Sequence, residues 1–293
     1  MEKKQKIGFI GLGLMGIPMS HRLIAAGYPL AVWNRNPAKT EALGAAGASV
    51  MPSISALVEA SDIVMLCVSN TDAVEQIVFG PGGIAENAHK GHLIIDFSSI
   101  DPQATRRFSE KLSSETGAGW IDAPVSGGVA GAEAGTLVVM AGGDETTIEG
   151  LGPLLSHLSQ KVTRMGPVGS GQATKICNQM LVSCNVMVMA EVLALAEKAG
   201  VDSRKIPEAL KGGFADSIPL QLTGTRMANR DFDDIKWHVK TLLKDLTMAS
   251  DLTEAMAGNT PMAQLAKNLM QQFSDDGYAE KDPCCLIEPY SNS

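Results

Sequence analysis

Several features that would define a function class by themselves are scarce in this sequence. Its 293 residues include five cysteines, at positions 67, 177, 184, 284 and 285, which form neither a Cys-x-x-Cys pair nor an even set. We therefore expect reduced thiols, as in a cytoplasmic protein, and no metal site. Lys and Arg (24) are outnumbered by Asp and Glu (32), which gives a net charge of −8. This balance argues against a nucleic-acid partner.

Long uninterrupted apolar runs are also missing. The most apolar stretch, Met180–Ala196, contains Ser183, Asn185 and Glu191, whereas a membrane span needs an apolar run of roughly 18 residues or more. The first lysines precede an apolar segment, as in a signal peptide, but that segment carries regularly spaced glycines and no clear cleavage site follows it. We therefore expect no membrane partner.

The chain is long enough for two domains, because it exceeds the usual length of roughly 100–200 residues per domain. Apolar residues at 45% and charged residues at 19% are typical of a soluble globular protein. Short strand-like runs alternate with helical segments up to about residue 165, and no strand pattern is convincing after Gly200. We expect a dinucleotide-binding domain at 1–165 and a helical domain at 166–293.

A long helix, at about 169–199, is predicted between the two halves. Glycines punctuate its start, no proline follows until Pro207, and Gly200 is a suitable end. The helix is apolar nearly all round, so we expect it to be packed on several sides. Lys175 and Asn178 stand three residues apart and therefore on one face. A cation and an amide beside a glycine-rich entry indicate a site.

The segment Gly11–Gly16, with the sequence GLGLMG, follows a strand-like run and opens a predicted helix. This is the Gly-x-Gly-x-x-Gly pattern, in which the glycines permit a tight turn, close approach of a pyrophosphate and close helix packing. The phosphates are then held by backbone N–H groups at the helix start. We expect the cofactor to contact Gly11, Leu12, Gly13, Leu14, Met15 and Gly16.

The end of the second predicted strand, Leu30–Trp33, bears on the choice of cofactor. An acidic residue there would bind the ribose 2′-hydroxyl of NAD, but the chain has Asn34 and Arg35. A neutral and a cationic side chain suit a 2′-phosphate, so NADP is favoured and NAD remains possible. Arg35 as a solvated surface residue would leave the choice open.

Further buried strands are predicted at 61–68, 92–96, 120–126, 136–141 and 161–165, which indicates a doubly wound α/β sheet. Ligands bind such sheets at loops that follow the strand ends. Ser69, Asn70, Ser98 and Ser99 are therefore candidates to border the nicotinamide, whereas helix capping is the preferred role for Thr71 and Asp101. Ser126, Gly127 and Gly128 follow another strand, and their N–H groups could hold an anion.

The second half is predicted to be all-helical, with helices at about 203–210, 217–227, 239–257 and 261–273 and a loosely ordered tail at 274–293. Lys244 and Asp245 lie within the third of these helices. Their spacing alone favours a solvated face over a site.

The chain resembles the β-hydroxyacid dehydrogenases, the group that includes 3-hydroxyisobutyrate dehydrogenase, tartronate semialdehyde reductase and glyoxylate/succinic semialdehyde reductases. Four motifs carry the resemblance, in order: GFIGLGLMGIPM at 8–19, DAPVSGG at 122–128, GSGQATKICNQ at 169–179 and KDL at 244–246. The resemblance covers nearly the whole chain. It implies a Rossmann-type domain joined by the long helix to a helical domain, with the active site in the cleft between them.

The resemblance also implies roles for individual residues. Lys175 would be the general acid/base, and Ser126 with Gly127 and Gly128 would hold the substrate carboxylate. Asn178 would orient the substrate and Ser99 would lie beside nicotinamide and substrate. Lys244, Asp245 and Trp237 would complete the pocket. Because a free lysine titrates near 10.4, we expect the helix start and desolvation to lower the pKa of Lys175.

The resemblance implies reversible interconversion of a small β-hydroxy carboxylate and its semialdehyde, with tartronate semialdehyde as the first candidate. Succinic semialdehyde, glyoxylate, methylmalonate semialdehyde and L-serine stay open. The chain is too short for a 6-phosphogluconate dehydrogenase, and imine reductases usually lack a lysine at this place. A non-catalytic dinucleotide-binding module is the alternative of another class, and intact Lys175, Asn178 and Asp245 argue against it. A homodimer or homotetramer is expected.

Overall fold

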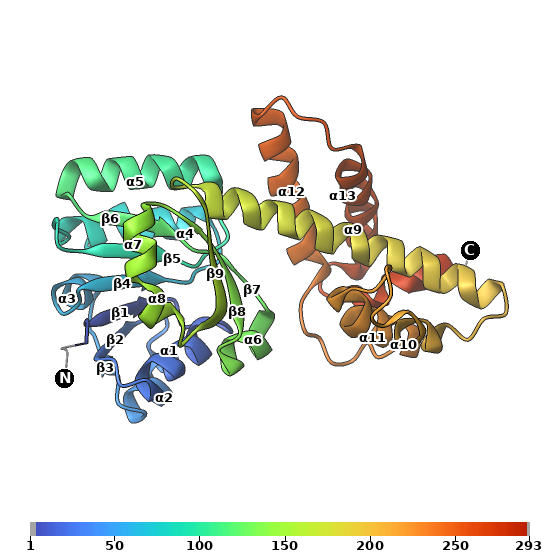
Figure 1. The fold of residues 1–293 in the computed structure, drawn as a ribbon, viewed down its shortest axis with the longest axis horizontal. Helices are drawn as coiled ribbons and strands as arrows, with labels where there is room; N and C mark the ends of the chain where they lie inside the picture. Colours follow the sequence, from blue (N-terminus) through green and yellow to red (C-terminus); the bar gives the residue numbers. More distant parts are fainter. Residues whose placement is uncertain (1–3, 292–293) are drawn as a thin grey trace. The chain divides into compact units, whose positions relative to one another are not determined.

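The computed structural model describes residues 4–291 and divides into two compact units, Met1–Lys175 and Ile176–Ser293, which are described separately (Figure 1). The boundary between these compact units falls inside the long helix, after Lys175. The first turn of this helix hydrogen-bonds to Asp122, at the end of a strand of the first unit. Lys175 therefore belongs to the same unit as the glycine pattern.

A mixed sheet forms the centre of the first unit, with helices on both faces (Figure 1). Its strands are β1 (Ile7–Ile10), β2 (Leu30–Trp33), β3 (Ser49–Val50), β4 (Ile63–Leu66), β5 (Leu93–Asp96), β6 (Gly119–Asp122), β7 (Val125–Ser126), β8 (Leu137–Gly142) and β9 (Ser159–Gly166). Its helices are α1 (Gly16–Ala25), α2 (Glu41–Ala45), α3 (Ile54–Glu59), α4 (Thr71–Phe79), α5 (Pro102–Thr116), α6 (Gly128–Ala134), α7 (Glu145–Gly150) and α8 (Gly152–Leu155). Short 3-10 turns lie at Pro37–Thr40 and Ile84–Glu86.

The strand order β3-β2-β1-β4-β5-β6 is parallel throughout, and β8 with β7 and β9 extends it beyond β6. The predicted doubly wound Rossmann-type sheet is thereby confirmed. The order reverses between β1 and β4, so the carboxyl ends of these strands form the crevice where such sheets bind ligands.

Burial on both faces explains why the central strands are continuously apolar. Every residue of β1 and β4 is buried. Ile7 and Phe9 of β1 enter one core cluster and Ile10 enters the other, because successive side chains of a strand point to opposite faces.

The segment 120–126, predicted as one strand, forms two. β6 ends at Asp122, and β7 begins at Val125 and pairs antiparallel with β8. Pro124 lies between them and has no N–H for a sheet ladder, so the continuous-strand prediction was wrong at this point.

The second unit is helical throughout its described part, as predicted. It contains most of α9 (Ser170–Lys198), then α10 (Ile206–Leu210), α11 (Thr225–Asn229), α12 (Val239–Ala255), α13 (Pro261–Phe273) and α14 (Glu288–Ser291). A 3-10 turn at Ser203–Lys205, π turns at Leu220–Gly224 and Ser274–Tyr278, and a 3-10 turn at Pro283–Ile287 connect them. The predicted helix at 203–210 is thus divided between a 3-10 turn and α10, and the one at 217–227 contains a π turn before α11.

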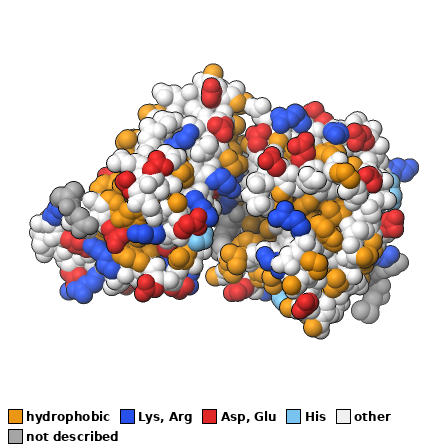
Figure 2. Space-filling model, turned by 180° about the vertical axis from the view of Figure 1, so that it is seen from behind, with side chains coloured by type: hydrophobic (Ala, Val, Ile, Leu, Met, Phe, Trp, Pro, Cys, Tyr) orange, Lys and Arg blue, Asp and Glu red, His pale blue; other side chains and the backbone are white. Residues whose placement is uncertain are grey.

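One side of α9 is the spine of the second unit's core. Val186, Ala190 and Leu193 are buried there against residues of α11, α12 and α13. The expectation that α9 is packed on several sides was wrong for this unit, because Leu181 and Leu195 are 70% and 68% exposed. By length and composition α9 could cross a membrane, but its buried side is part of a globular core. Figure 2 shows charged side chains of both signs interspersed with hydrophobic ones on the face drawn.

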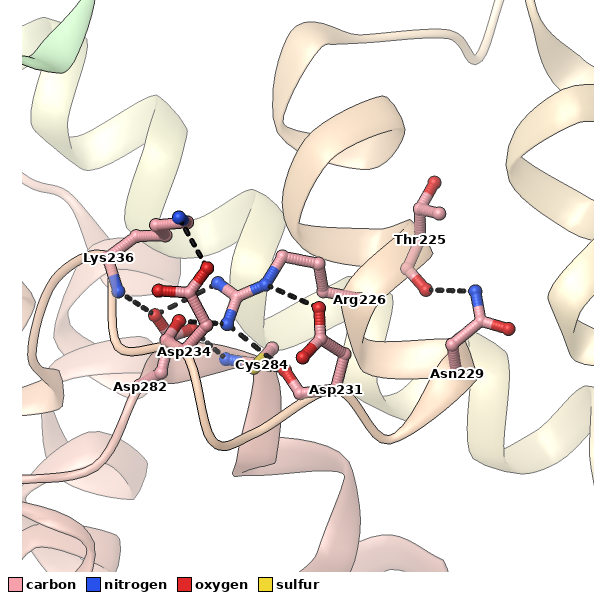
Figure 3. Close-up of polar contacts among 8 residues, drawn as sticks. All are labelled: Thr225, Arg226, Asn229, Asp231, Asp234, Lys236, Asp282 and Cys284. Atoms are coloured by element: carbon pink, nitrogen blue, oxygen red, sulfur yellow. Dashed lines mark hydrogen bonds and ion pairs between the residues drawn. The ribbon is translucent and has the colours of Figure 1, made fainter. Parts of the chain in front are cut away.

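The tail predicted to be loosely ordered is ordered through residue 291, and positions 292 and 293 lie outside the described residues. Cys284, Leu286 and Ile287 belong to the second unit's core. Asp282 anchors this segment, because its Oδ2 accepts from Arg226 Nη1 at 3.0 Å and from the Lys236 backbone N–H at 2.8 Å (Figure 3). The partners stand 56 and 46 residues away in sequence, so composition near the tail could not reveal them.

Candidate active site

The three glycines of the Gly11–Gly16 turn meet different surroundings. Gly11 has φ +98°, and a Cβ built on it would lie 2.2 Å from the Cys67 carbonyl oxygen. A Cβ on Gly16 would lie 2.0 Å from the Gly11 carbonyl oxygen. A Cβ on Gly13 would meet no atom within 4 Å. Gly11 and Gly16 therefore serve the turn and helix packing, and Gly13 keeps its side open for a pyrophosphate.

Alanine at these positions is expected to separate cofactor binding from folding. Gly13→Ala should weaken NADPH binding by about tenfold or more, which corresponds to ~1.4 kcal/mol, because the methyl occupies the cofactor's side of the turn and touches no protein atom. Gly16→Ala should lower the free energy of unfolding by about 1–3 kcal/mol, since the methyl overlaps the Gly11 carbonyl. Fluorescence titration and thermal unfolding measure the two effects. Unchanged NADPH affinity in Gly13→Ala would show that this side of the turn does not face the cofactor.

Asn34 and Arg35 follow β2 and differ in how they are engaged. The Asn34 Oδ1 accepts from the Leu12 backbone N–H at 2.9 Å, which fixes the end of β2 to the glycine turn. Arg35 is exposed, and within residues 4–291 its guanidinium makes no hydrogen bond or ion pair. Asn34 thus shapes the turn, and Arg35 retains all its donors for a phosphate.

The loops after β4 and β5 carry the next candidates. Ser69 and Asn70 are exposed, and the Asn70 side chain caps α4 by accepting from the Ala73 N–H at 2.9 Å. The predicted capping role of Asp101 is confirmed, because it accepts from two N–H groups of α5. The predicted capping role of Thr71 was wrong: its hydroxyl accepts from the Asp101 N–H instead.

Ser98 and Ser99 have separate roles in the loop after β5. Ser98 is buried, and its hydroxyl accepts from the Val68 N–H at 2.9 Å. Ser99 is partly exposed. Of the two serines, Ser99 therefore remains the candidate for contact with a ligand.

The segment Ser126–Gly128 joins β7 to α6 at the surface. Gly127 and Gly128 are exposed and have φ +133° and +61°. A Cβ on Gly128 would meet no atom within 4 Å. The backbone here is open to a small anion, as the carboxylate-binding prediction requires, and a residue with a side chain at either glycine would be strained.

The start of α9 is fixed by Asp122, a residue that the sequence analysis gave no role. Its Oδ1 accepts from the Gly169 N–H at 2.7 Å and its Oδ2 from the Gln172 N–H at 2.9 Å. Gly171 lies so close to β6 and β8 that a Cβ would be 2.3 Å from the Met140 carbonyl oxygen. These contacts set the position of Lys175, one turn further along. Asp122 and Gln172 both lie inside the motifs that carry the family resemblance, and this position could have indicated in the sequence that they matter for the site.

A second buried carboxylate, Asp96, lies at the end of β5 beside β6. Its Oδ1 accepts from the Ser98 N–H at 2.9 Å, whereas its Oδ2 is buried with no hydrogen-bond partner in the described chain. Burial raises the pKa of Asp96 to about 7, and the neighbouring Asp122 adds to the shift. Burial also raises the pKa of Asp122, although the hydrogen bonds that its carboxylate accepts from the Gly169 and Gln172 N–H groups act to lower it.

This shift predicts a pH effect on stability. Because the folded-state pKa of about 7 lies above the ordinary value of 3.8, the stabilising contribution is complete below pH 3.8 and is lost as the pH rises through 7. Asp96→Asn cannot ionise and should not lose it. The free energy of unfolding of the variant, relative to the natural chain, should rise by a few kcal/mol between pH 4 and pH 8. Denaturant titrations at the two pH values measure this. An equal difference at both would mean that Asp96 is ionised throughout.

In the second unit, polar contacts connect the predicted residues Asn178, Lys244 and Asp245. Gln179, which was not predicted, lies between Asn178 and Asp245 in this network. Asn178 Nδ2 donates to Gln179 Oε1 at 2.8 Å, and Gln179 Nε2 donates to Asp245 Oδ2. Lys244 Nζ lies 3.4 Å from Asp245 Oδ1, and Asp245 is buried. The preference for a solvated face from spacing alone was therefore wrong for Asp245. Gln179 is the last residue of the quoted GSGQATKICNQ motif.

Trp237 is partly buried and packs against the apolar core of the second unit. Within residues 4–291 no group of three or more His, Cys, Asp or Glu side chains is arranged to hold a metal ion.

A mixed sheet whose parallel strands have the Rossmann order and a glycine turn open at Gly13 define a dinucleotide-binding protein. Residues 6–166 match the NAD binding domain of 6-phosphogluconate dehydrogenase, and residues 169–290 match the NAD-binding domain of NADP-dependent 3-hydroxyisobutyrate dehydrogenase. The chain belongs to the β-hydroxyacid dehydrogenase family.

Similar proteins support this assignment over the full length. The chain is 38% identical to 2-hydroxy-3-oxopropionate reductase of Escherichia coli, over 97% of this chain and 96% of that one. It is 33% identical to NAD-dependent L-serine dehydrogenase of Pseudomonas aeruginosa, over 95% of each. The structure of Mycobacterium tuberculosis 3-hydroxyisobutyrate dehydrogenase with L-serine matches with a TM-score of 0.87 and 30% identity, over 98% of this chain and 99% of that one. The protein is thus an NAD(P)-dependent dehydrogenase that acts on CH–OH groups.

Proposed function

We propose that this enzyme is an NADP-dependent 2-hydroxy-3-oxopropionate (tartronate semialdehyde) reductase. The observation that carries the proposal is the 38% identity to the Escherichia coli enzyme of that name over nearly the whole of both chains. The exposed guanidinium of Arg35, which has no partner within residues 4–291, supports NADP over NAD.

The proposed reaction assigns a task to each part of the first unit. When bound, NADPH would be held by Gly11–Gly16 and Arg35 and would supply hydride to the substrate carbonyl carbon. Ser126 and the N–H groups of Gly127 and Gly128 hold the substrate carboxylate, which turns binding into orientation. Lys175 donates the proton that the carbonyl oxygen requires as its charge develops, and it accepts that proton in the reverse direction.

The proposal assigns tasks to further residues of each unit separately. In the first unit, Ser99 is assigned to the nicotinamide and substrate. In the second unit, Asn178, Trp237, Lys244 and Asp245 are assigned to ligand binding, with Asp245 held by Gln179 and Lys244. Asn34, Ser69 and Asn70 border the cofactor.

The test is oxidation of NADPH and of NADH, at matched concentrations, with tartronate, succinic and methylmalonate semialdehydes and glyoxylate, together with L-serine in the oxidative direction. We expect tartronate semialdehyde with NADPH to give the highest kcat/KM. A higher value with L-serine and NAD would assign the chain to the activity named for its Pseudomonas aeruginosa relative. No turnover with any substrate would favour a non-catalytic dinucleotide-binding module.

Arg35→Ala should raise the KM for NADPH by about 10–100-fold and leave the KM for NADH unchanged, because a charge-assisted hydrogen bond to a phosphate is worth about 1.5–3 kcal/mol. Arg107→Ala, an exposed arginine of α5, is the matched control. Equal effects of Arg35→Ala on the KM values for both cofactors would show that Arg35 does not bind the 2′-phosphate of NADP.

The assembly and location follow the same reasoning. We propose a homodimer or homotetramer, because Leu181, Val188 and Leu195 form an exposed apolar line on α9. A cytoplasmic enzyme is proposed from the reduced cysteines. Light scattering of the purified protein checks the assembly, and a monomer would exclude it.

A further inference from the structure

Gln172 lies in the first turn of α9 and is 1% exposed. Its side-chain Nε2 donates to the Ser98 carbonyl at 2.8 Å, and its Oε1 accepts from the Ile100 N–H at 3.1 Å. These two backbone groups flank Ser99. One amide thus holds the backbone on both sides of the partly exposed Ser99.

The same residue is also fixed through its backbone and leads directly to Lys175. Its backbone N–H donates to Asp122 Oδ2 at 2.9 Å, so the start of α9 is tied to the end of β6. Lys175 follows three residues later in the same helix. At a rise of about 1.5 Å per residue, this places it roughly 4.5 Å further along the axis and on the same side. Gln172 therefore joins the loop of Ser99 and the helix of Lys175 in one rigid group.

We propose that Gln172 is a positioning residue that sets Ser99 relative to Lys175. The inference rests on the proposed function, which gives Ser99 and Lys175 their tasks. Gln172 acts through these two residues, because its Nε2 is engaged by the Ser98 carbonyl and its Oε1 by the Ile100 N–H. Without the amide, the Ser98 carbonyl and the Ile100 N–H lose their hydrogen-bond partner inside the protein. Because an unpaired buried polar group is costly, we expect the loop that contains Ser99 to shift. Hydride and proton transfer are sensitive to such shifts, because a misplacement of about 1 Å can cost about 100-fold in rate.

The test compares Gln172→Met, which keeps the length and loses both hydrogen bonds, with Gln172→Glu at pH 6. The charged groups on the surrounding elements are chiefly acidic: Asp122 on β6, Asp96 on β5 and Asp101 before α5, with Arg106 on α5 and Lys175 on α9 as the cations. These acidic neighbours and burial keep the new carboxyl group of Gln172→Glu protonated at pH 6, so that it can donate to Ser98 and accept from Ile100.

We expect Gln172→Met to lower kcat by about 10–100-fold with the Kd for NADPH within about threefold of the natural chain, and Gln172→Glu to recover much of kcat at pH 6. Ser61→Ala is the control for the loss of a buried hydrogen bond. The Ser61 hydroxyl donates to the Leu57 carbonyl at 2.6 Å, just before the start of β4 and away from the strand ends that carry the site. It should lower Tm and leave kcat unchanged. A normal kcat in Gln172→Met, or equal losses in both Gln172 variants, overturns the proposal.

Two further measurements cover the case in which Gln172→Met does not fold and the case in which the natural chain is inactive. If Gln172→Met does not fold, the kcat of Gln172→Glu relative to the natural chain must fall as the pH rises from 6 to 9, and a constant ratio overturns the proposal. If the natural chain reduces none of the semialdehydes, the proposed function fails by itself. Amide hydrogen exchange of segment 97–101 in Gln172→Met then decides: faster exchange supports the positioning role, and unchanged exchange excludes it.

Discussion

Lys175→Met is expected to lower kcat by about 10²–10⁴, the range that a positioned general acid contributes. The methionine keeps the length of the side chain and removes the proton. NADPH binding should persist, because the cofactor contacts are assigned to Gly11–Gly16 and Arg35, elsewhere in the first unit. Steady-state kinetics with the best substrate of the panel and a fluorescence titration of NADPH measure the two quantities.

Lys198→Met provides the matched control, because it removes an exposed lysine from the last turn of the same helix. Its kcat should equal that of the natural chain. If Lys175→Met turned over at a near-normal rate while binding NADPH, the proton would have to come from another group and the proposed chemistry would be wrong. A deuterium isotope effect on hydride transfer that changes only in Lys175→Met would strengthen the assignment.

The parts of this site that could be predicted from sequence are those in which a local pattern has one steric explanation. Gly11 and Gly16 have no room for a Cβ, and Gly13 has open space beside it. These are the conditions that the Gly-x-Gly-x-x-Gly pattern predicts for strand, turn and helix. The continuous apolar runs of β1 and β4 similarly predict strands buried on both faces.

The parts that could not be predicted depend on contacts between distant segments. Asp122 holds the start of α9 from 47 and 50 residues away, and Gln172 reaches the loop after β5 across 72 and 74 residues. Each residue lies in a motif that the resemblance supplied, but their tasks follow only from the sheet order that brings β5, β6 and α9 together. The spacing of Lys244 and Asp245 was misleading for the same reason: the partner Gln179 is 66 residues from Asp245.

The order of the C-terminal segment, 274–291, could not be predicted from its local sequence. The sequence SDDGYAEKDP at 274–283 is polar and suggested a loose tail. The structure places the Asp282 side chain at 0% exposure, with hydrogen bonds to Arg226, Lys236 and Cys284. A charged residue in a polar stretch is usually solvated, and only the distant Arg226 makes its burial possible.

Arg226→Met is therefore expected to lower the free energy of unfolding of the second unit by about 3–5 kcal/mol, because it leaves the Asp282 carboxylate buried without its charged partner. Burial would raise the pKa of Asp282, but hydrogen bonds from Cys284, Lys236 and Arg226 outweigh it and lower the pKa below 3.8. A lowered pKa stabilises the fold above 3.8, and this contribution is lost as the pH falls through the folded-state value. The deficit of Arg226→Met should accordingly shrink in acid.

Lys236→Met is the matched comparison. It removes a lysine whose ion pair with Asp234 is solvated, since the two side chains are 61% and 63% exposed, and it leaves the Lys236 backbone N–H on Asp282 (Figure 3). Its cost should be about 0–1 kcal/mol. Denaturant unfolding, with hydrogen exchange of segment 283–287 to follow the second unit, measures both variants. A loss below about 1 kcal/mol in Arg226→Met, no larger than that of an exposed pair, would mean that water or another cation reaches Asp282. The buried pair would then not be what holds the C-terminal segment in the core.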